Sequence, residues 1–255
     1  IAETNGSAPL IEVLGTPTVF ETAPANQSSI TAISATKAVV VYSDSGNSSR
    51  GTACVLDVSG SIITPGTPVV FETGSTSRPS VTTLSATQAL VSYVDSGDGS
   101  KGKSCILDIS GSIITPGTSA IHYNSSTNWP SVTALSSTQA LVTFDDNVNT
   151  RGASCVLDVS GSTITPGATI SYASDSLVCN KVSTLNSTTA IVAYREESSP
   201  SVVKVAGLSV SGSVVTSLGA KDVVENNIFS LDIVALSEKK AVLLYYTSAP
   251  LDLMV

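Results

Sequence analysis

The sequence repeats itself about every 51 residues along nearly its whole length, and this period limits the fold more than any other feature. A four-residue landmark of the form Thr-Ala-Leu-Ser, or a close variant, begins at Thr31, Thr82, Thr133, Ser183 and Val234. The tripeptide Ser-Gly-Ser recurs four times at the same period, and Ile-Thr-Pro-Gly recurs three times. Internal repeats of this length are typical of solenoids, propellers and repeat arrays.

Each repeat contains four short runs rich in Val, Ile, Leu, Thr and Tyr. In the second repeat they cover residues 80–85, 88–95, 102–110 and 112–123. Ser, Gly, Asn and Asp separate the runs, which is typical of β-strands joined by tight turns, and no helical period is present. A four-stranded unit of this length, repeated around an axis, predicts a β-propeller. We therefore predict an all-β, five-bladed β-propeller of four-stranded antiparallel blades.

The last repeat lacks its outer strand, and the N-terminus supplies a match for it. Residues 9–21 resemble the outer-strand segment 62–72, so we expect the N-terminal strand to close the fifth blade. Deletion of residues 1–21 should then expose a sheet edge. The predicted single domain, residues 1–255, has blades at about 22–72, 73–123, 124–173, 174–224, and 225–255 plus 1–21.

Charge and hydropathy exclude several classes of partner. The formal net charge is −8, with a sequence pI of about 4.5, and this repels phosphate backbones and anionic lipid. The longest apolar runs, such as residues 38–42, are far too short to span a bilayer. We expect neither nucleic-acid binding nor membrane insertion.

The cysteines predict neither disulfides nor a metal site. Cys54, Cys105 and Cys155 fall at the same position in three successive repeats, a blade width apart and too far for a disulfide. Cys179 matches none of them. No close Cys and His spacing suggests zinc. We expect buried thiols that fill the gaps between blades, with no cofactor.

Carboxylates recur in two places. Asp57, Asp108 and Asp158 each precede a Ser-Gly-Ser turn, where we expect them to cap that hairpin. A second acidic loop is a weak candidate for calcium, although it lacks the usual Asp-rich spacing and an ordinary solvated hairpin is the favoured alternative. Its candidate ligands are Asp145, Asp146, Asn147 and Asn149.

The loops that lead into each inner strand diverge between repeats, whereas the other turns are nearly identical. Loops on a rigid frame commonly carry function, so we expect the contact surface on this rim, near the third blade. Trp129 is the only tryptophan and His122 the only histidine. The alternative is that Trp129 simply packs over a blade junction. The candidate ligand-binding residues are Arg78, His122, Tyr123, Asn128, Trp129 and Phe229.

Catalytic groups are scarce. His122 has no Gly-x-Ser-x-Gly serine to serve, and the inner strands offer a single carboxylate, Asp232. A glycosidase would have to combine Asp232 with Glu225 or Asp175, and this is the weakest hypothesis. We predict that the protein is not an enzyme.

Segments 66–72, 88–91 and 131–136 resemble the tandem propeller repeats of secreted bacterial and phage appendage proteins. The overall architecture is similar to that of the five-bladed tachylectin-type lectins. This resemblance implies an extracellular, cell-surface or virion location, and a glycan or cell-surface receptor as the partner.

Two functional hypotheses follow. The first is a non-enzymatic recognition or adhesion module, extracellular or on a virion, that binds glycan through the variable rim. The second is a structural subunit of a fibre, coat or extracellular matrix, which the low charge and few aromatic residues favour. Either protein could act as a homo-oligomer or within a larger assembly.

Overall fold

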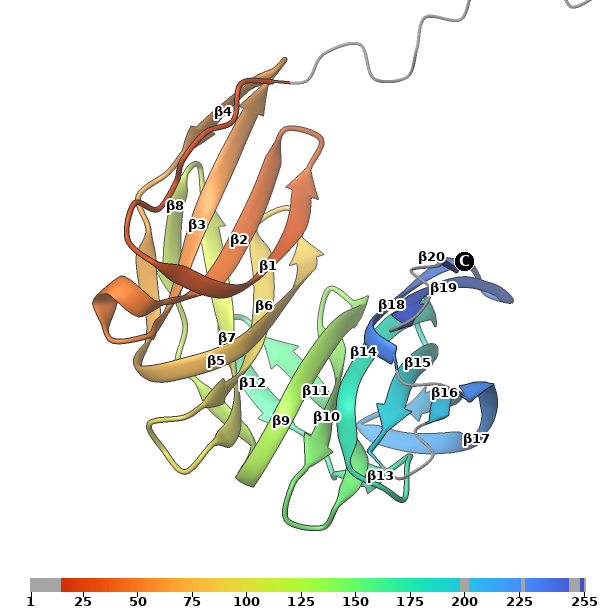
Figure 1. The fold of residues 1–255 in the computed structure, drawn as a ribbon. Helices are drawn as coiled ribbons and strands as arrows, with labels where there is room; N and C mark the ends of the chain where they lie inside the picture. The colour runs from red at the N-terminus through yellow and green to blue at the C-terminus, as the bar shows by residue number, and fades with distance from the viewer. Residues whose placement is uncertain (1–14, 198–201, 226–227, 248–252, 255) are drawn as a thin grey trace, which may run out of the picture.

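The computed structural model describes residues 15–197, 202–225, 228–247 and 253–254. About three-quarters of these residues lie in antiparallel β-strands (Figure 1). The one helical element among them is η1 (Ser45–Asn47), a single 3-10 turn, so no described helix is long enough to cross a membrane. The prediction of an all-β antiparallel chain is confirmed.

The strand pairings follow the sequence repeat. β5 (Val69–Ser85) and β9 (Ala120–Ser136) each belong to two units, because they begin as the outer strand of one unit and end as the inner strand of the next. The first two units contain β1 (Ala25–Ser34), β2 (Lys37–Asp44), β3 (Arg50–Ser59), β4 (Ile62–Pro65), β6 (Gln88–Asp95), β7 (Lys101–Ser110) and β8 (Ile113–Pro116). The third contains β10 (Gln139–Asp146), β11 (Arg151–Ser160), β12 (Thr163–Pro166) and β13 (Ile170–Ser171). The remaining strands are β14 (Leu177–Asn186), β15 (Thr189–Glu196), β16 (Val202–Ser211), β17 (Val214–Glu225), β18 (Ile228–Ser237), β19 (Lys240–Thr247) and β20 (Leu253–Met254).

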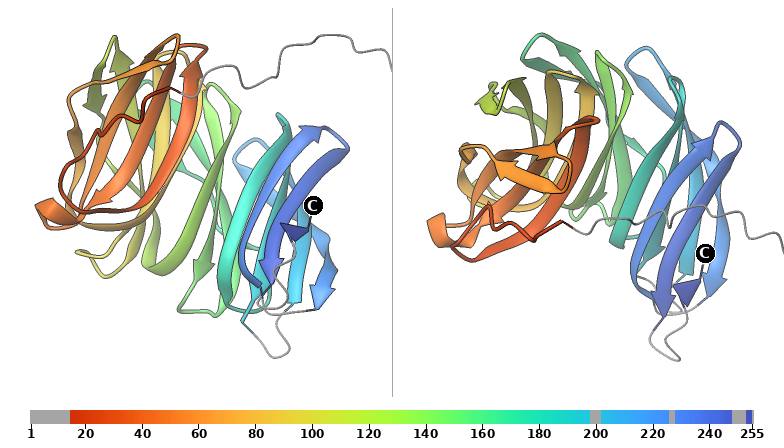
Figure 2. Two further views of the ribbon diagram at one scale, coloured as in Figure 1. Left: turned by 45° about the horizontal axis from the view of Figure 1, so that its top comes forward. Right: turned by 90° about the horizontal axis from the view of Figure 1, so that it is seen from above.

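The units stand side by side in an arc, with their inner strands adjacent (Figures 1 and 2). The inner strands are β1, the second halves of β5 and β9, β14, and β18. Radially repeated antiparallel sheets packed face against face are the blades of a β-propeller. Among the described residues, no ladder joins the sheet of β1 to the sheet of β18–β20.

Hydroxyl groups link each inner strand to the next. Ser29 Oγ accepts a hydrogen bond of 3.2 Å from the backbone N–H of Val81, and Ser80 Oγ does the same for Val132. The Oγ1 atoms of Thr31 and Thr83 lie 2.9 Å apart. These bonds satisfy backbone donors that no ladder reaches, which explains why Ser and Thr recur along the inner strands.

An aromatic contact joins the outer segment of each unit to the second strand of the next. Phe71 and Tyr93 have ring centroids 5.2 Å apart, in a tilted arrangement. The same contact recurs as Phe20–Tyr42, His122–Phe144 and Tyr172–Tyr194. Such pairs add to the apolar burial between neighbouring sheets.

The repeated aspartates differ from the prediction in their target. Asp57 does not cap its own Ser-Gly-Ser turn; its carboxylate accepts a hydrogen bond from Ser112, in the turn of the next unit. Asp108 and Ser162 form the equivalent bond, as do Asp158 and Ser213. The carboxylate therefore joins two units, which a pattern read within one repeat does not reveal.

The glycine of each Pro-Gly pair is required by the same junction. A Cβ atom on Gly66 would lie 2.4 Å from the carbonyl oxygen of Ser112 in the next unit. The corresponding distances are 2.7 Å for Gly117 and 2.4 Å for Gly167. No side chain fits at these distances, so the repeat keeps glycine there.

The N-terminal residues that the structure describes pack on the first unit as an outer segment would. A Cβ on Gly15 would lie 2.2 Å from the carbonyl oxygen of Ser61 in the first unit. This matches the close approach of Gly66 to Ser112 in the second unit. Tyr42 Oη donates to Glu21 Oε2 at 3.0 Å, and Tyr93 donates to Glu72 at 2.8 Å. Residues 15–21 form no strand, and residues 9–14 of the predicted closing strand lie outside the described residues.

All four cysteines are buried free thiols, as predicted. Burial raises the pKa of Cys105 and of Cys155 to about 12. Because the thiolate is the reactive form, these side chains act as small apolar groups in the core.

Candidate functional site at the mouth of the inner strands

A two-residue bulge precedes the inner strand in each of the first three units. It consists of Gln27 and Ser28 in the first, and its register breaks recur before Ser80 and Ser131. The first residue of each bulge has a positive φ, with values of 51° for Gln27, 52° for Arg78 and 48° for Trp129. Proline follows Arg78 and Trp129 and fixes the chain direction after the turn.

Positive φ is unfavourable for residues with side chains, by about 1–3 kcal/mol for each residue. Glycine would relieve this strain, yet these positions carry Gln, Arg and Trp. The side chains are therefore held at the end of the inner strands at a cost in stability. We call this end, lined by residues 27–29, 78–80, 129–130 and 180–181, the mouth.

The bulges are joined to one another by hydrogen bonds. The backbone N–H of Arg78 donates to Gln27 Oε1 at 2.7 Å. Asn180 Nδ2 donates to the carbonyl oxygen of Trp129 at 2.5 Å, and its Oδ1 accepts from Thr143 Oγ1 at 2.7 Å. These bonds connect the first two bulges to each other and the third bulge to β14.

Arg78 and Trp129 come together in the mouth from two different units. The guanidinium carbon of Arg78 lies 3.4 Å from the centroid of the Trp129 ring, which is a close cation–π contact. Trp129 also packs against a core cluster that includes Cys179 and Leu231. Trp129 therefore both covers a blade junction and contributes to the mouth.

The mouth contains a hollow of about 370 Å³, within the size range of small-ligand sites. Seven of the ten lining residues are polar, although apolar atoms supply more of the lining surface than polar atoms do, and the two positive charges are those of Arg78 and Lys181. None of the described lining residues is a carboxylate. The lining consists of Gln27, Ser28, Ser29, Arg78, Pro79, Ser80, Trp129, Pro130, Asn180 and Lys181.

Burial dominates the electrostatics of Arg78. It lowers the pKa of the guanidinium, while the charge of Asp145 acts in the opposite direction. The Nη1 atom of Arg78 is buried and has no hydrogen-bond partner among the described residues. An unpaired buried donor costs about 1–3 kcal/mol, so this atom adds to the cost of holding Arg78 in place.

Asp145 lies behind the mouth in an apolar setting. Burial raises its pKa to about 6, although a 2.9 Å hydrogen bond from the backbone N–H of Leu177 acts to lower it. The carboxylates of Glu197, Asp146 and Asp175 add to the upward shift. Asp145 is thus the carboxylate whose charge acts on Arg78, and it is held by the backbone N–H of Leu177.

At this position of the repeat Lys181 replaces the linking serine, although Ser183 in the same strand still accepts the N–H of Ala235 at 2.9 Å. Ser131, at the same position one repeat earlier, accepts the N–H of Val182 at 3.1 Å. The ammonium group of Lys181 has only donors, so it cannot accept an N–H in this way. Asp232 instead accepts the N–H of its own neighbour, Ile233, at 2.9 Å. The carboxylate proposed for hydrolysis is therefore engaged with the backbone.

The other predicted contact residues lie elsewhere. His122 is buried, its Nδ1 lies 2.9 Å from Ser104 Oγ, and burial lowers its pKa to about 3. Tyr123 packs on Phe144, beside His122 in β9. Asn128 Oδ1 accepts the N–H of Trp129 at 3.1 Å and so supports the bulge. Phe229 lies in β18, and its side chain is outside the described residues.

The calcium candidates are engaged with protein donors. Asp146 Oδ2 accepts from Arg151 Nε at 2.9 Å and from Asn149 Nδ2 at 2.8 Å. Asn147 Nδ2 donates to Ser126 Oγ at 3.1 Å, and Asp145 Oδ1 accepts the backbone N–H of Leu177 at 2.9 Å. Within the described ranges, no group of three or more His, Cys, Asp or Glu side chains could hold a metal ion.

Several lining residues were not among the sequence candidates: Gln27, Ser29, Ser80, Asn180 and Lys181. One signal could have identified the bulge. Arg78-Pro79-Ser80 and Trp129-Pro130-Ser131 align at the repeat spacing, and a residue before proline at the start of a strand is typical of an irregular entry. Gln27 and Asn180 line the mouth because they bond to Arg78 and Trp129 in other repeats, and no pattern within a single repeat predicts those bonds.

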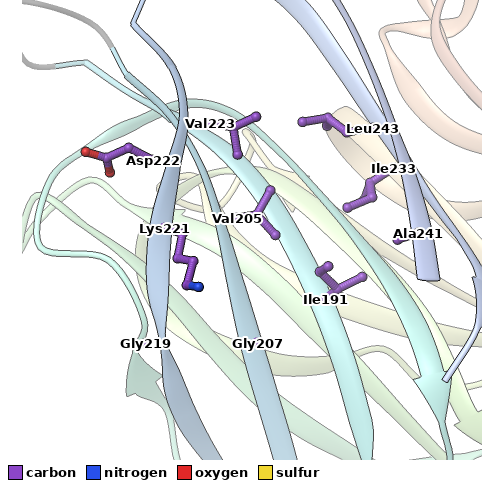
Figure 3. Close-up of a pocket in the computed structure, with 10 residues that line it drawn as sticks. All are labelled: Ile191, Val205, Gly207, Gly219, Lys221, Asp222, Val223, Ile233, Ala241 and Leu243. Atoms are coloured by element: carbon purple, nitrogen blue, oxygen red, sulfur yellow. The ribbon is translucent and has the colours of Figure 1, made fainter. Parts of the chain in front are cut away.

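A second and larger hollow, of about 670 Å³, separates the last two units. Figure 3 shows Ile191 and Val205 facing Ile233 and Leu243 across it. In the second unit, β7 and β8 supply Leu107, Ile109 and Ile114 to the equivalent junction. The last unit has β18, β19 and the short β20 among its described strands, so this hollow marks incomplete packing between sheets.

Comparison with protein-family models and with curated proteins gives no match. Among solved structures, a protein from Lactobacillus plantarum is 15% identical, with a TM-score of 0.56 over 89% of this chain and 69% of that one. An alpha-L-arabinanase from Penicillium chrysogenum, complexed with arabinobiose, is 10% identical, with a TM-score of 0.53 over 92% and 78%. AofleA from Arthrobotrys oligospora is 7% identical, with a TM-score of 0.50 over 88% and 80%. At these identities the likeness is one of fold alone.

Proposed function

We propose that the protein is a non-enzymatic recognition module that binds glycan in the mouth. The observation that carries the proposal is the Arg78–Trp129 pair, held on two strained bulges above a polar hollow of about 370 Å³. Strain that is retained at a surface favours a functional reading, since glycine would remove it.

The chemistry of the hollow suits a saccharide. Sugars present many hydroxyl groups around small apolar faces, and their sites combine directional hydrogen-bond partners with an aromatic surface. Here Ser29, Ser80 and Lys181 surround the stacked pair. The arabinanase of similar fold is complexed with arabinobiose, and this supports the proposal of a saccharide ligand.

The lining also supports a role without catalysis. Glycoside hydrolysis normally needs two carboxyl groups about 5–10 Å apart, across the scissile bond. The described lining residues include none, and Asp232 is engaged with Ile233. The pairing of Asp232 with Glu225 or Asp175 therefore has no support from this hollow.

For the architecture, we propose a ring of five blades in which the N-terminal strand completes the fifth. Residues 15–21 already make, against the first unit, the contacts that residues 66–72 make against the second. The hollow of Figure 3 lies where the missing outer strands of the last unit would pack. Closure would bury this apolar surface.

We propose an extracellular, cell-surface or virion location, with a glycan or a glycosylated cell-surface receptor as the partner. The negative net charge argues against nucleic acid. Calcium plays no part in this proposal, because the acidic loop is held by its own amides and by Arg151.

A glycan array combined with a cell-binding assay tests the function. The wild type should bind a restricted set of glycans, and Trp129→Ala should lose at least tenfold in affinity. Val148→Ala, at an exposed loop position outside the mouth, is the matched control and should bind as the wild type does. Equal binding by Trp129→Ala and the wild type would place recognition elsewhere.

A structural subunit remains the second candidate, and exposed apolar side chains at the ends of the arc favour it. Ile30 in the first unit is 62% exposed, and Leu236 in the last is 65% exposed. Such side chains could be buried between copies in a fibre or coat. Native mass spectrometry and electron microscopy that show only monomers would remove this candidate.

A further inference from the structure

We infer that the ligand in the mouth is an acidic saccharide, with its carboxylate bound by Arg78 and Lys181. The inference rests on the proposed glycan recognition and adds the chemical class of the ligand. It follows from the balance of donors and acceptors in the mouth and from the local charge.

Three hydrogen-bond acceptors in the mouth already receive a donor from the protein. Gln27 Oε1 receives the backbone N–H of Arg78, and Asn180 Oδ1 receives the hydroxyl of Thr143. The backbone carbonyl of Trp129 receives Asn180 Nδ2. A ligand that needs to donate hydrogen bonds would find few of these groups available.

The donors, by contrast, are still available. Ser29 and Ser80 each accept a backbone N–H at Oγ, and neither hydroxyl donates a hydrogen bond within the described part of the chain. Arg78 also lines the hollow, although its unpaired Nη1 atom is buried, so a ligand would meet the rest of the guanidinium. The Lys181 side chain is exposed and lines the hollow. A ligand rich in acceptor oxygens satisfies these groups.

Charge selects a carboxylate among such ligands. The chain as a whole carries a net charge of −8, yet the described lining has two cations and no acid. A positively charged hollow in an acidic protein concentrates anions locally. The planar guanidinium matches a carboxylate with two parallel hydrogen bonds, which are roughly twice as strong as neutral ones.

The hollow limits the size of the ligand, and the stacked pair defines its orientation. About 370 Å³ accommodates one or two sugar rings. Arg78 covers one face of the Trp129 ring at 3.4 Å, so a carboxylate can approach the edge of the guanidinium while a sugar ring lies over the proline and serine side chains. A uronic acid residue combines both features.

The test compares acidic glycans with their carboxyl-reduced forms, in which each uronate becomes a neutral hexose of the same shape. Oligogalacturonate, oligoglucuronate and alginate fragments serve as probes, and titration calorimetry measures binding to the wild type. We expect at least one uronate to bind, with a reduced form at least tenfold weaker and with affinity that falls between 50 and 200 mM salt. Sodium acetate at equal carboxylate concentration should not compete.

Variants separate the contributions. Arg78→Gln and Lys181→Ala should each weaken uronate binding at least fivefold, with little effect on any residual binding of the reduced form. Lys101→Ala removes the same charge from a hairpin loop, where Lys101 pairs with Asp98 at 3.0 Å, and should bind as the wild type does. The circular dichroism spectrum confirms that each variant is folded.

The remaining outcomes overturn distinct statements. Equal affinity for a uronate and its reduced form would refute the acidic ligand while leaving glycan recognition in place. If acetate at the same concentration competes with the uronate, the mouth binds any carboxylate, and the claim that it recognises a saccharide is refuted. Failure of every acidic and neutral glycan to bind would refute both this inference and the proposed function.

Discussion

Replacement of His122 by phenylalanine should remove a large part of the acid sensitivity of the fold. His122 is buried between Gly102 and Phe144, and burial lowers its pKa to about 3 from an ordinary value of 6.5. Its Nε2 has no hydrogen-bond partner among the described residues. The equivalent position in the first unit holds Phe71, which packs over Gly51 in the same way, so a phenyl ring should fit.

The magnitude follows from proton linkage. The pKa of His122 is lower in the folded state, so the unfolded state binds more protons and the unfolding free energy falls as the pH decreases below 6.5. With pKa values of 6.5 and about 3, the loss is about 1.4 kcal/mol at pH 5.5 and about 2.7 kcal/mol at pH 4.5. At pH 7.5 it is close to zero.

Urea denaturation followed by circular dichroism, at pH 7.5, 5.5 and 4.5, measures the difference between His122→Phe and the wild type. The stability advantage of the variant should grow by about 2.5 kcal/mol from pH 7.5 to pH 4.5. The reciprocal variant Phe71→His should acquire the matching acid sensitivity. A constant difference at all three pH values would refute the buried, neutral histidine.

Three further predictions concern the scaffold. Asp145→Asn should raise the melting temperature at pH 7.5. Because the pKa of Asp145 is raised to about 6 in the folded state, the free energy of unfolding falls by up to about 3 kcal/mol as the pH rises from 4 to 6. An asparagine amide does not titrate, so the variant avoids this loss. A melting temperature that falls by several degrees would contradict it. Gly66→Ala should destabilise by about 1–3 kcal/mol, because its Cβ would lie 2.4 Å from the Ser112 oxygen, whereas Thr67→Ala at the exposed next residue should be neutral in urea denaturation. The four thiols should resist iodoacetamide in the native state and react together on unfolding, as intact-mass measurement would show; rapid native labelling of Cys105 or Cys155 would disagree with their raised pKa values.

The scaffold could be predicted from the sequence because it repeats. Strand positions, the tight turns and the buried Cys54, Cys105 and Cys155 all follow from residues that recur every 51 positions. Contacts between repeats could not be assigned in this way. The pattern shows that Asp57 and Ser112 recur, but not that the carboxylate of one unit reaches the turn of the next.

The mouth was harder to predict, because it depends on backbone geometry. The sequence singles out Arg78 and Trp129 as unusual rim residues, and the structure brings them together through positive-φ bulges. His122 was chosen because it is the only histidine, yet its position within the repeat matches the buried Phe71. Comparison of that position across repeats would have placed His122 in the core.

The central claim is that ligand binds in the mouth, which Trp129 helps to line, and fluorescence tests it directly. Trp129 is the only tryptophan, so its emission reports on the mouth alone. Titration with a glycan selected from the array should give a saturable change in emission whose midpoint matches the calorimetric affinity and moves at least fivefold in Arg78→Gln. Binding detected by calorimetry with no change in Trp129 emission would contradict the account.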